Sequence, residues 1–198
     1  MEASDASQSL GVVLLAAGSS SRLGRPKQLV SINGQSLVRR QTQLLEHLRA
    51  ASTIVVTGAV ESEIHQALDG IPVQFVHNPN WEKGMGSSLA CAIKQLPERV
   101  RGVLVLLCDQ WQIDSHDLKR LIDAWSGNPM CAVAAEWNNI IGPPVIFPRS
   151  VFDRLSRLKG EQGARQVLRR GKTEVIRIKM EHASQDLDVP ADLAQLES

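Results

Sequence analysis

The 198-residue sequence lacks the signatures of disulfide-rich, zinc-binding and membrane-spanning proteins. It has three cysteines, Cys91, Cys108 and Cys131, and an odd number without CxxC spacing argues against a disulfide framework or a zinc knuckle. The five histidines include no HxxxH or HxH pair, so no histidine metal site is expected. No apolar run is long enough to span a bilayer, and the N-terminus lacks the basic start and apolar stretch of a signal peptide. We therefore expect a cytoplasmic protein in which residues 1–9 form a disordered tail.

An excess of charge of one sign is also absent. Lys and Arg together number 22 and Asp and Glu 21, which gives a formal net charge of +1. Bulk electrostatics therefore provides no reason to expect nucleic acid or a membrane as a partner, and any anion-binding site must be local. The length, with 43% hydrophobic and 22% charged residues, is typical of one globular domain, which we place at residues 10–198.

Short apolar runs alternate with amphipathic segments along the chain. Strands are predicted at residues 12–15, 54–56, 73–76, 103–107 and 132–135, and helices between them at residues 37–48, 61–68, 87–96 and 115–125. Uninterrupted apolar strands suit a sheet that is covered on both faces. The alternation predicts an α/β fold: a single-domain, doubly wound, mostly parallel and Rossmann-like sheet with helices on both faces.

The C-terminal part of the chain is less regular. Residues 143–147 are interpreted as an edge strand, because prolines are tolerated at the edge of a sheet. Helices are predicted at residues 151–158 and 163–169, followed by a strand at 174–178 and an acidic turn at 186–190.

The strongest functional signal is the segment LLAAGSSSRLGRPK, residues 14–27. It follows a buried strand and therefore lies at the carboxyl end of that strand, where open α/β sheets bind ligands. The small AAG residues at 16–18 let backbone N–H groups approach a phosphate chain, and Arg22 and Lys27 add positive charge. The spacing differs from that of the Walker A and GxGxxG loops. From spacing alone, a solvated basic turn is the alternative.

Acidic residues at two places could hold a metal. Asp109 follows the most apolar strand, and hard divalent cations prefer carboxylate oxygens beside substrate phosphates. A turn or helix-capping role is the alternative, but Asp114 and Ser115 are better placed as caps. Asp186 and Asp188 form a second acidic site, and they could share a metal with Asp109 only if the fold joins the two segments.

A fourth signal is the segment NPNWEKGMGSS, residues 78–88, which follows a strand and opens a helix. Gly84 and Gly86 permit close backbone approach, and Ser87 and Ser88 can cap the helix or bond a ligand. A capped helix start without any ligand is the alternative.

Together these segments resemble the molybdenum cofactor cytidylyltransferases, a branch of the MobA-like NTP transferases. The resemblance extends from about residue 11 to residue 193. It rests on LAAGSSSRLGRPKQ at 15–28, NPNWEKGMGSSL at 78–89, CDQ at 108–110, GEQGAR at 160–165 and DLDVPAD at 186–192. The AAG form with RPKQ is similar to the cytidylyl branch, whereas the LAGG form of the guanylyl branch is absent.

The resemblance implies a nucleotide-diphospho-sugar-transferase-like fold and transfer of CMP from CTP to molybdopterin, with release of pyrophosphate. It assigns catalysis to Lys27, Arg22 and Asp109, and Mg²⁺ binding to Asp109 and Asp188. Nucleotide binding is assigned to Leu15, Ala16, Ala17, Gly18, Ser19, Arg22, Lys27, Asn78, Gly84, Ser87 and Ser88.

Three departures from the family pattern concern the acceptor. Trp111 stands where the family usually has proline, Pro143 occupies a usually polar position, and Val189 replaces threonine. Trp111 could stack on a pterin ring or serve only packing. The residues expected near the acceptor are Gln110, Trp111, Gly142 and Pro144.

The sequence is also compatible with other functions. A sugar-phosphate or alditol-phosphate nucleotidyltransferase would use the same first loop and the same aspartate. A chaperone that binds the finished cofactor and docks on a molybdenum hydroxylase belongs to a different class, and docking could accompany turnover. A non-catalytic nucleotide-binding module is disfavoured, because the acidic pair, Asp109 and Asp188, is present.

Overall fold

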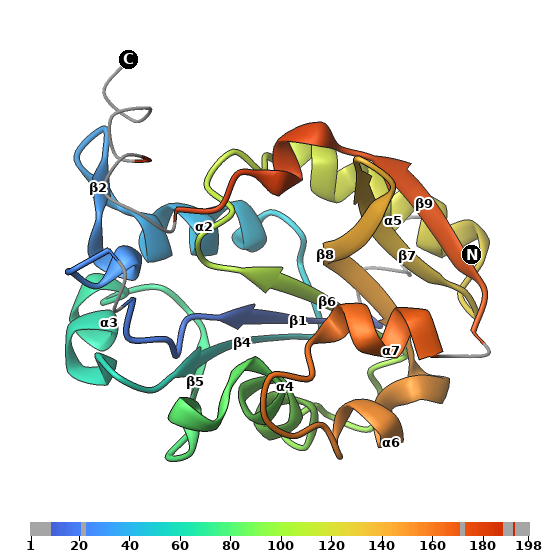
Figure 1. The fold of residues 1–198 in the computed structure, drawn as a ribbon, viewed down its shortest axis with the longest axis horizontal. Coiled ribbons are helices and arrows are strands. Elements are labelled where there is room, and N and C mark those ends of the chain that lie inside the picture. Colours follow the sequence, from blue (N-terminus) through green and yellow to red (C-terminus); the bar gives the residue numbers. More distant parts are fainter. Residues whose placement is uncertain (1–8, 21–22, 171–172, 188–191, 193–198) are drawn as a thin grey trace.

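The computed structural model describes residues 9–20, 23–170, 173–187 and 192. Its centre is a seven-stranded sheet (Figure 1). In spatial order the strands are β5 (Gln74–His77), β4 (Ser52–Thr57), β1 (Leu10–Leu15), β6 (Gly102–Leu107), β8 (Ile140–Pro148), β7 (Ala132–Trp137) and β9 (Val175–Lys179). A separate two-strand ribbon, β2 (Ser31–Ile32) with β3 (Gln35–Ser36), was not predicted from the sequence.

The sheet is mostly parallel, as the sequence predicts. The pairs β1–β4, β1–β6, β4–β5 and β7–β9 are parallel, and only β8 runs against its neighbours β6 and β7. The carboxyl ends of β1, β4, β5 and β6 therefore meet at one edge of the sheet, where the loops with functional signals begin.

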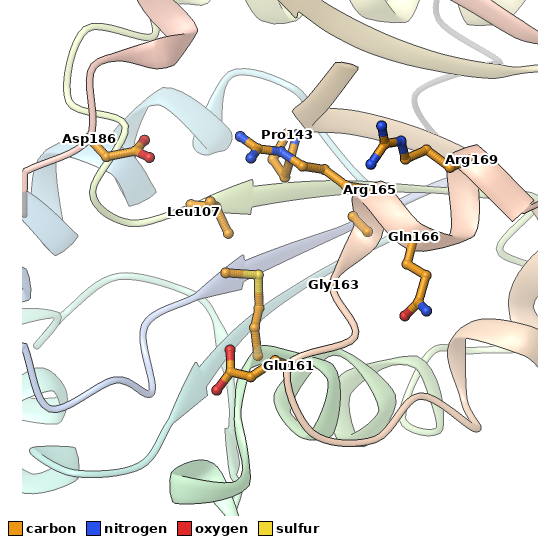
Figure 2. A pocket seen from close by; sticks show the side chains of 10 residues that line it. Leu107, Pro143, Glu161, Gly163, Arg165, Gln166, Arg169 and Asp186 are labelled. Atoms are coloured by element: carbon orange, nitrogen blue, oxygen red, sulfur yellow. The ribbon is translucent and has the colours of Figure 1, made fainter. Parts of the chain in front are cut away.

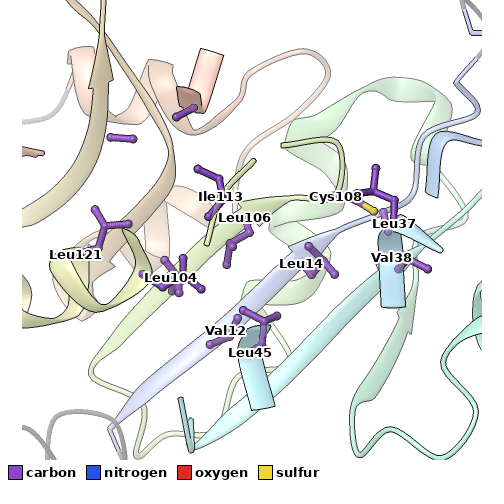
Figure 3. Packing of buried hydrophobic residues seen from close by; sticks show 14 of the residues in the cluster. Val12, Leu14, Leu37, Val38, Leu45, Leu104, Leu106, Cys108, Ile113 and Leu121 are labelled. Carbon is purple, nitrogen blue, oxygen red and sulfur yellow. The ribbon is translucent and has the colours of Figure 1, made fainter. Parts of the chain in front are cut away.

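Helices cover both faces, and alternate residues of each strand point to opposite cores. One face packs against α2 (Leu37–Glu46) and α5 (Ser115–Gly127), and the close-up in Figure 3 shows this core around Val12, Leu14 and Leu104. The other face packs against α4 (Met85–Ile93), α6 (Phe152–Leu155) and α7 (Ala164–Arg170), which lie together on one side of the sheet in Figure 1. The structure also contains α3 (Glu61–Ala67) and the short 3-10 turns η1 (Lys27–Leu29), η2 (Trp81–Lys83), η3 (Arg149–Val151) and η4 (Glu181–Ser184).

The prediction of an edge strand at residues 143–147 is wrong, because β8 lies between β6 and β7. The register of β7 with β8 explains how an interior strand accommodates two prolines. Ala134 pairs with Val145, whereas Ala135 pairs with Gly142, so residues 143 and 144 bulge out of the ladder. A bulged residue needs no ladder hydrogen bond, and a missing N–H is therefore tolerated there.

Helix starts differ in detail from the prediction. Helix α4 begins at Met85 rather than at Ser87, and Gly84 is its N-cap residue with φ of 107°. Asp114 does cap α5: its side chain accepts from the Asp117 N–H, and the Asp117 carboxylate accepts from the Asp114 N–H. This reciprocal capping box satisfies two backbone donors at the helix start.

Of the predicted N-terminal tail, only Ser9 falls within the described residues, and its carbonyl accepts a hydrogen bond from the Arg101 N–H at 2.7 Å. Within the described part of the chain, no helix is both long and apolar enough to cross a membrane.

Candidate active site

The loop after β1 is held by the end of β4 and by Gln28. The Ala16 N–H donates to the Val56 carbonyl at 3.0 Å, and the Ala17 carbonyl accepts from the Ala59 N–H at 3.1 Å. The buried Gln28 side chain donates from Nε2 to the carbonyls of Ala16 and Gly18, at 2.9 and 2.7 Å. Gln28 therefore sets the path of the loop, a role that the sequence analysis missed.

Lys27 and Asp109 meet in the structure although 82 positions separate them. Lys27 begins η1, and its backbone N–H donates to Ser20 Oγ at 3.0 Å. Its Nζ forms an ion pair with Oδ2 of Asp109, and the two side chains are 19% and 13% exposed. The pair forms because β1 and β6 are adjacent and parallel, with Leu15 opposite Leu107.

The fold also brings the acidic turn to Asp109. The backbone N–H of Leu187 donates to the Asp109 carbonyl at 3.1 Å, and the Leu187 side chain is fully buried. The fold therefore joins Asp109 to the part of the acidic turn formed by Asp186 and Leu187, as a shared metal site requires. Asp188 and Arg22 lie outside the described residues, so their assigned roles stay predictions.

Asn78 organises the loop between β5 and α4. Its Nδ2 donates to Oγ of Ser87 at 2.8 Å and to Oγ of Ser88 at 2.9 Å, while its Oδ1 accepts from the Asn80 N–H at 3.0 Å. Only 3% of Asn78 is exposed. The geometry makes Asn78 and Ser87 supports of this loop, and Ser88 the residue that faces the cavity described next.

A cavity of about 440 Å³ lies at this edge of the sheet, between the loop after β1, the start of α4 and the end of β6. Eight of the predicted nucleotide-binding residues line it: Leu15, Ala16, Ala17, Gly18, Ser19, Lys27, Gly84 and Ser88. We call this space the loop cavity. Asp109 lines it too, and so do residues that sequence reasoning did not assign, namely Gln28, Trp81, Glu82, Met85, Leu107, Cys108 and Glu161.

Two glycines shape this cavity by close approach. A Cβ at Gly58 would lie 2.6 Å from the Ala17 carbonyl oxygen and 2.7 Å from Cγ of Trp81, so glycine lets Trp81 pack against the loop. A Cβ at Gly84 would lie 2.7 Å from the carbonyl oxygen of Gly160, which brings the segment around Glu161 against the start of α4. The sequence predicted a close backbone approach at Gly84 but gave no such signal at Gly58, where the neighbours come from distant segments.

A second cavity of about 520 Å³ adjoins the first, and Figure 2 shows its lining. The two share Met85, Leu107 and Glu161. The rest of the second cavity is lined by Pro143, Gly163, Ala164, Arg165, Gln166, Arg169 and Asp186. We call it the arginine cavity, because two side chains of α7 supply its positive charge.

The four residues predicted at the acceptor are not among those that line either cavity. Gln110 is 2% exposed and donates from Nε2 to the carbonyls of Pro143 and Ala183, at 2.8 and 2.7 Å. Trp111 packs, partly buried, against the core on the α2 and α5 face. Gly142 and Pro144 are buried and flank Pro143, which does line the arginine cavity.

Cys108 lies beside the ion pair but is not suited to be a nucleophile. Burial raises the pKa of its thiol, the negative charge of Asp109 raises it further, and Lys27 opposes the shift. A thiol that stays protonated is unreactive. A separate cluster, Asp114, His116 and Asp117, places carboxylates and an imidazole near one another. Asp114 and Asp117 already form the capping box of α5, and Asp117 also contacts His182 Nε2 at 2.6 Å.

Comparison with known proteins decides the family. The model of the MobA-like NTP transferase domain matches residues 12–175, which include the first loop, the ion pair and both cavities apart from Asp186. The chain belongs to the MobA-like NTP transferase family.

Three relatives illustrate the similarity. The purine catabolism protein PucB of Bacillus subtilis is 26% identical over 195 residues, 91% of this chain and 92% of PucB. The crystal structure of Rv0371c from Mycobacterium tuberculosis has a TM-score of 0.84 and 26% identity, covering 97% of this MobA-like chain and 100% of Rv0371c. Rv0371c has also been solved in complex with manganese, with a TM-score of 0.76, 26% identity and coverage of 94% and 97%. Molybdopterin-guanine dinucleotide biosynthesis protein A of Archaeoglobus fulgidus shares the fold at 17% identity, with a TM-score of 0.72 and coverage of 94% and 96%.

Proposed function

We propose that this MobA-like protein transfers CMP from CTP to the phosphate of a molybdopterin-type acceptor and releases pyrophosphate. The observation that carries the proposal is the pair of adjoining cavities, with the Lys27–Asp109 ion pair lining the first and two arginines lining the second. A transferase must hold a donor and an acceptor side by side, and the shared lining of the two cavities provides that arrangement.

The loop cavity is suited to the nucleotide triphosphate. No heavy atom lies within 4 Å of the Cβ position at Gly18, so the backbone there is open to a ligand. Lys27 supplies a positive charge from the same loop, and backbone N–H groups with a lysine are a common cradle for phosphates. The AAG form of the loop and its resemblance to the cytidylyl branch support CTP as the donor.

The reaction needs no covalent intermediate with the protein. An oxygen of the acceptor phosphate bonds to the α-phosphorus of CTP while the bond from that phosphorus to the pyrophosphate oxygen breaks. Lys27 would neutralise the charge that gathers on the phosphates, and the loop backbone would hold them in line with the acceptor.

The carboxylate groups at this site fit a divalent cation. Asp109 lines the loop cavity and Asp186 lines the adjoining one, and carboxylate oxygens are the ligands that Mg²⁺ prefers. We propose that Asp109 and Asp188 hold Mg²⁺. When bound, the ion would offset negative charge on the α-phosphate. The manganese complex of the similar protein Rv0371c supports a divalent cation at this site.

The test measures pyrophosphate release from each of CTP, GTP, ATP and UTP with Mg²⁺, with and without molybdopterin. We expect release from CTP that depends on molybdopterin and stops when EDTA removes the metal. Preference for GTP or ATP would contradict the cytidylyl assignment. Turnover with a sugar phosphate or an alditol phosphate, but not with molybdopterin, would identify the other acceptor class. Binding of the finished dinucleotide cofactor without turnover would favour the chaperone.

A further inference from the structure

Three residues from three elements meet beside the arginine cavity, and one of them, Arg165, lines it. The guanidinium carbon of Arg165, on α7, lies 5.0 Å from the centroid of the Trp137 ring at the end of β7. At Gly142, on β8, a Cβ would lie 2.8 Å from Nε of Arg165 and 2.9 Å from Cη2 of Trp137. Gly142 therefore lies against both the Arg165 side chain and the Trp137 ring, and any larger residue there would clash with both. Such packing restricts the orientation of the guanidinium.

No carboxylate of the described residues neutralises Arg165. Within that part of the chain no Asp or Glu lies within ion-pair distance of its side chain, whereas Arg177, on the neighbouring strand β9, pairs with Glu136 at 3.0 Å. Arg165 is also exposed and lines the arginine cavity. An oriented, accessible guanidinium without a carboxylate partner is well suited to bind an anion of the ligand.

The direction of the side chain points to one part of that ligand. In Figure 2, Arg165 extends from α7 past Pro143 toward Leu107 and Asp186, while Arg169 lies farther along the helix. Leu107 lines both cavities and is two residues from Asp109. An anion held by Arg165 would therefore lie on the side of the arginine cavity where the two cavities adjoin.

We propose that Arg165 binds the phosphate monoester of the acceptor, and that Gly142 is required because any larger residue would displace its guanidinium. The inference rests on the proposed function for the direction of transfer. Arg165 would contact the acceptor phosphate directly. Gly142 would act through Arg165, by leaving room for its guanidinium, although Gly142 itself does not line the cavity.

The test compares Arg165→Gln, Arg165→Lys and Gly142→Ala with the wild-type protein. Arg154→Gln, an exposed arginine of α6 that lines neither cavity, and Gly127→Ala, whose Cβ would have no neighbour within 4 Å, are the matched controls. Calorimetry would measure the Kd of inorganic phosphate, molybdopterin and CTP separately, and thermal unfolding would confirm that each variant is folded.

We expect Arg165→Gln and Gly142→Ala to raise the Kd of inorganic phosphate and molybdopterin by about tenfold or more, because a charge-assisted bidentate contact is lost or displaced. The Kd of CTP should stay within about twofold, a change of under 0.5 kcal/mol. Arg165→Lys should be intermediate, since it keeps the charge but not the planar group that stacks on Trp137. Both controls should match the wild type.

Unchanged phosphate and molybdopterin affinities in Arg165→Gln would overturn the inference, and so would an equal loss of CTP affinity, which would place Arg165 at the nucleotide. Failure of the proposed CMP transfer would give a different result from failure of the Arg165 inference. In that case wild-type protein releases no pyrophosphate from CTP and molybdopterin. The phosphate titration still decides the role of Arg165: a weaker Kd in Arg165→Gln supports it, and an equal Kd contradicts it.

Discussion

The backbone N–H of Leu187 donates a hydrogen bond to the carbonyl oxygen of Asp109. This contact fastens the C-terminal acidic turn to the end of the central strand β6. Asp109 thus has two separate roles, since its main chain holds the turn while its carboxylate pairs with Lys27. Asp109→Asn separates the two roles, because it removes the carboxylate charge and keeps the backbone carbonyl.

Lys27→Ala should lower kcat far more than it raises KM for CTP. The lysine charge is most useful where negative charge gathers in the transition state, so we expect kcat to fall on the order of 10²-fold or more. Lys27→Arg should rescue poorly, because a planar fork replaces a compact charge in a tight loop. Steady-state kinetics would measure both constants. Lys119→Ala is the control, because Lys119 pairs with Asp123 on the exposed side of α5. An unchanged kcat in Lys27→Ala would remove the lysine from catalysis even if CTP binding weakened.

Asp109→Asn should abolish most turnover and leave the fold intact. The amide is nearly isosteric with the carboxylate, and the backbone carbonyl can still accept from Leu187. We expect a loss on the order of 10²-fold or more in kcat/KM, because a neutral amide is a weak ligand for Mg²⁺ and a weak partner for Lys27. Asp123→Asn provides the matched control. Near-normal turnover in a folded Asp109→Asn protein would argue against the metal role.

Gly58→Ala should destabilise the protein and weaken nucleotide binding. The added methyl group would meet the Ala17 carbonyl oxygen and the Trp81 side chain at 2.6 and 2.7 Å. Overpacking of this kind costs about 1–3 kcal/mol of unfolding free energy. Thermal unfolding and CTP titration would measure the two effects, with Gly127→Ala as the control. If both values match the wild type, the close approach at Gly58 does not shape the loop cavity.

Gln110→Leu should reveal whether Gln110 supports the site or contacts the acceptor. The substitution keeps the approximate volume but removes the buried donor shared by the Pro143 and Ala183 carbonyls. Two buried acceptors would lose their partner, and we expect unfolding free energy to fall by roughly 1–3 kcal/mol or more. Gln66→Leu, at an exposed position of α3, is the comparison. Unchanged stability with a raised KM for the acceptor would instead favour a direct contact.

Cys108 should resist alkylation in the native protein at about pH 9, where an ordinary thiol is half ionised. Its raised pKa means that the folded state keeps the proton while the unfolded state, with a pKa near 9.0, loses it. The contribution of Cys108 to stability is therefore complete below pH 9 and declines as the pH rises above it. Iodoacetamide labelling followed by mass spectrometry would test this, with the half-buried Cys91 as the internal reference. Labelling of Cys108 at the rate of Cys91 would contradict the prediction.

The sequence alone determined the class of fold and the first loop. The strands β1, β4 and β6 could be predicted from their own residues, because a strand buried on both faces must be apolar along its whole length. The loop with Lys27 could also be found from the sequence, because small residues directly after a strand let the backbone approach a ligand closely. Eight residues assigned to the nucleotide from the sequence do line one cavity.

Only the tertiary structure decided which distant residues meet. The sequence could not show that Asp109 pairs with Lys27, that Leu187 binds the Asp109 carbonyl, or that β8 is an interior strand. Strand order and the docking of α7 bring these together, and both depend on burial of many side chains rather than on any local pattern. Arg165 shows this most clearly. The sequence identifies it only as a helix residue, whereas Trp137 on β7 and Gly142 on β8 restrict the orientation of its guanidinium in the structure.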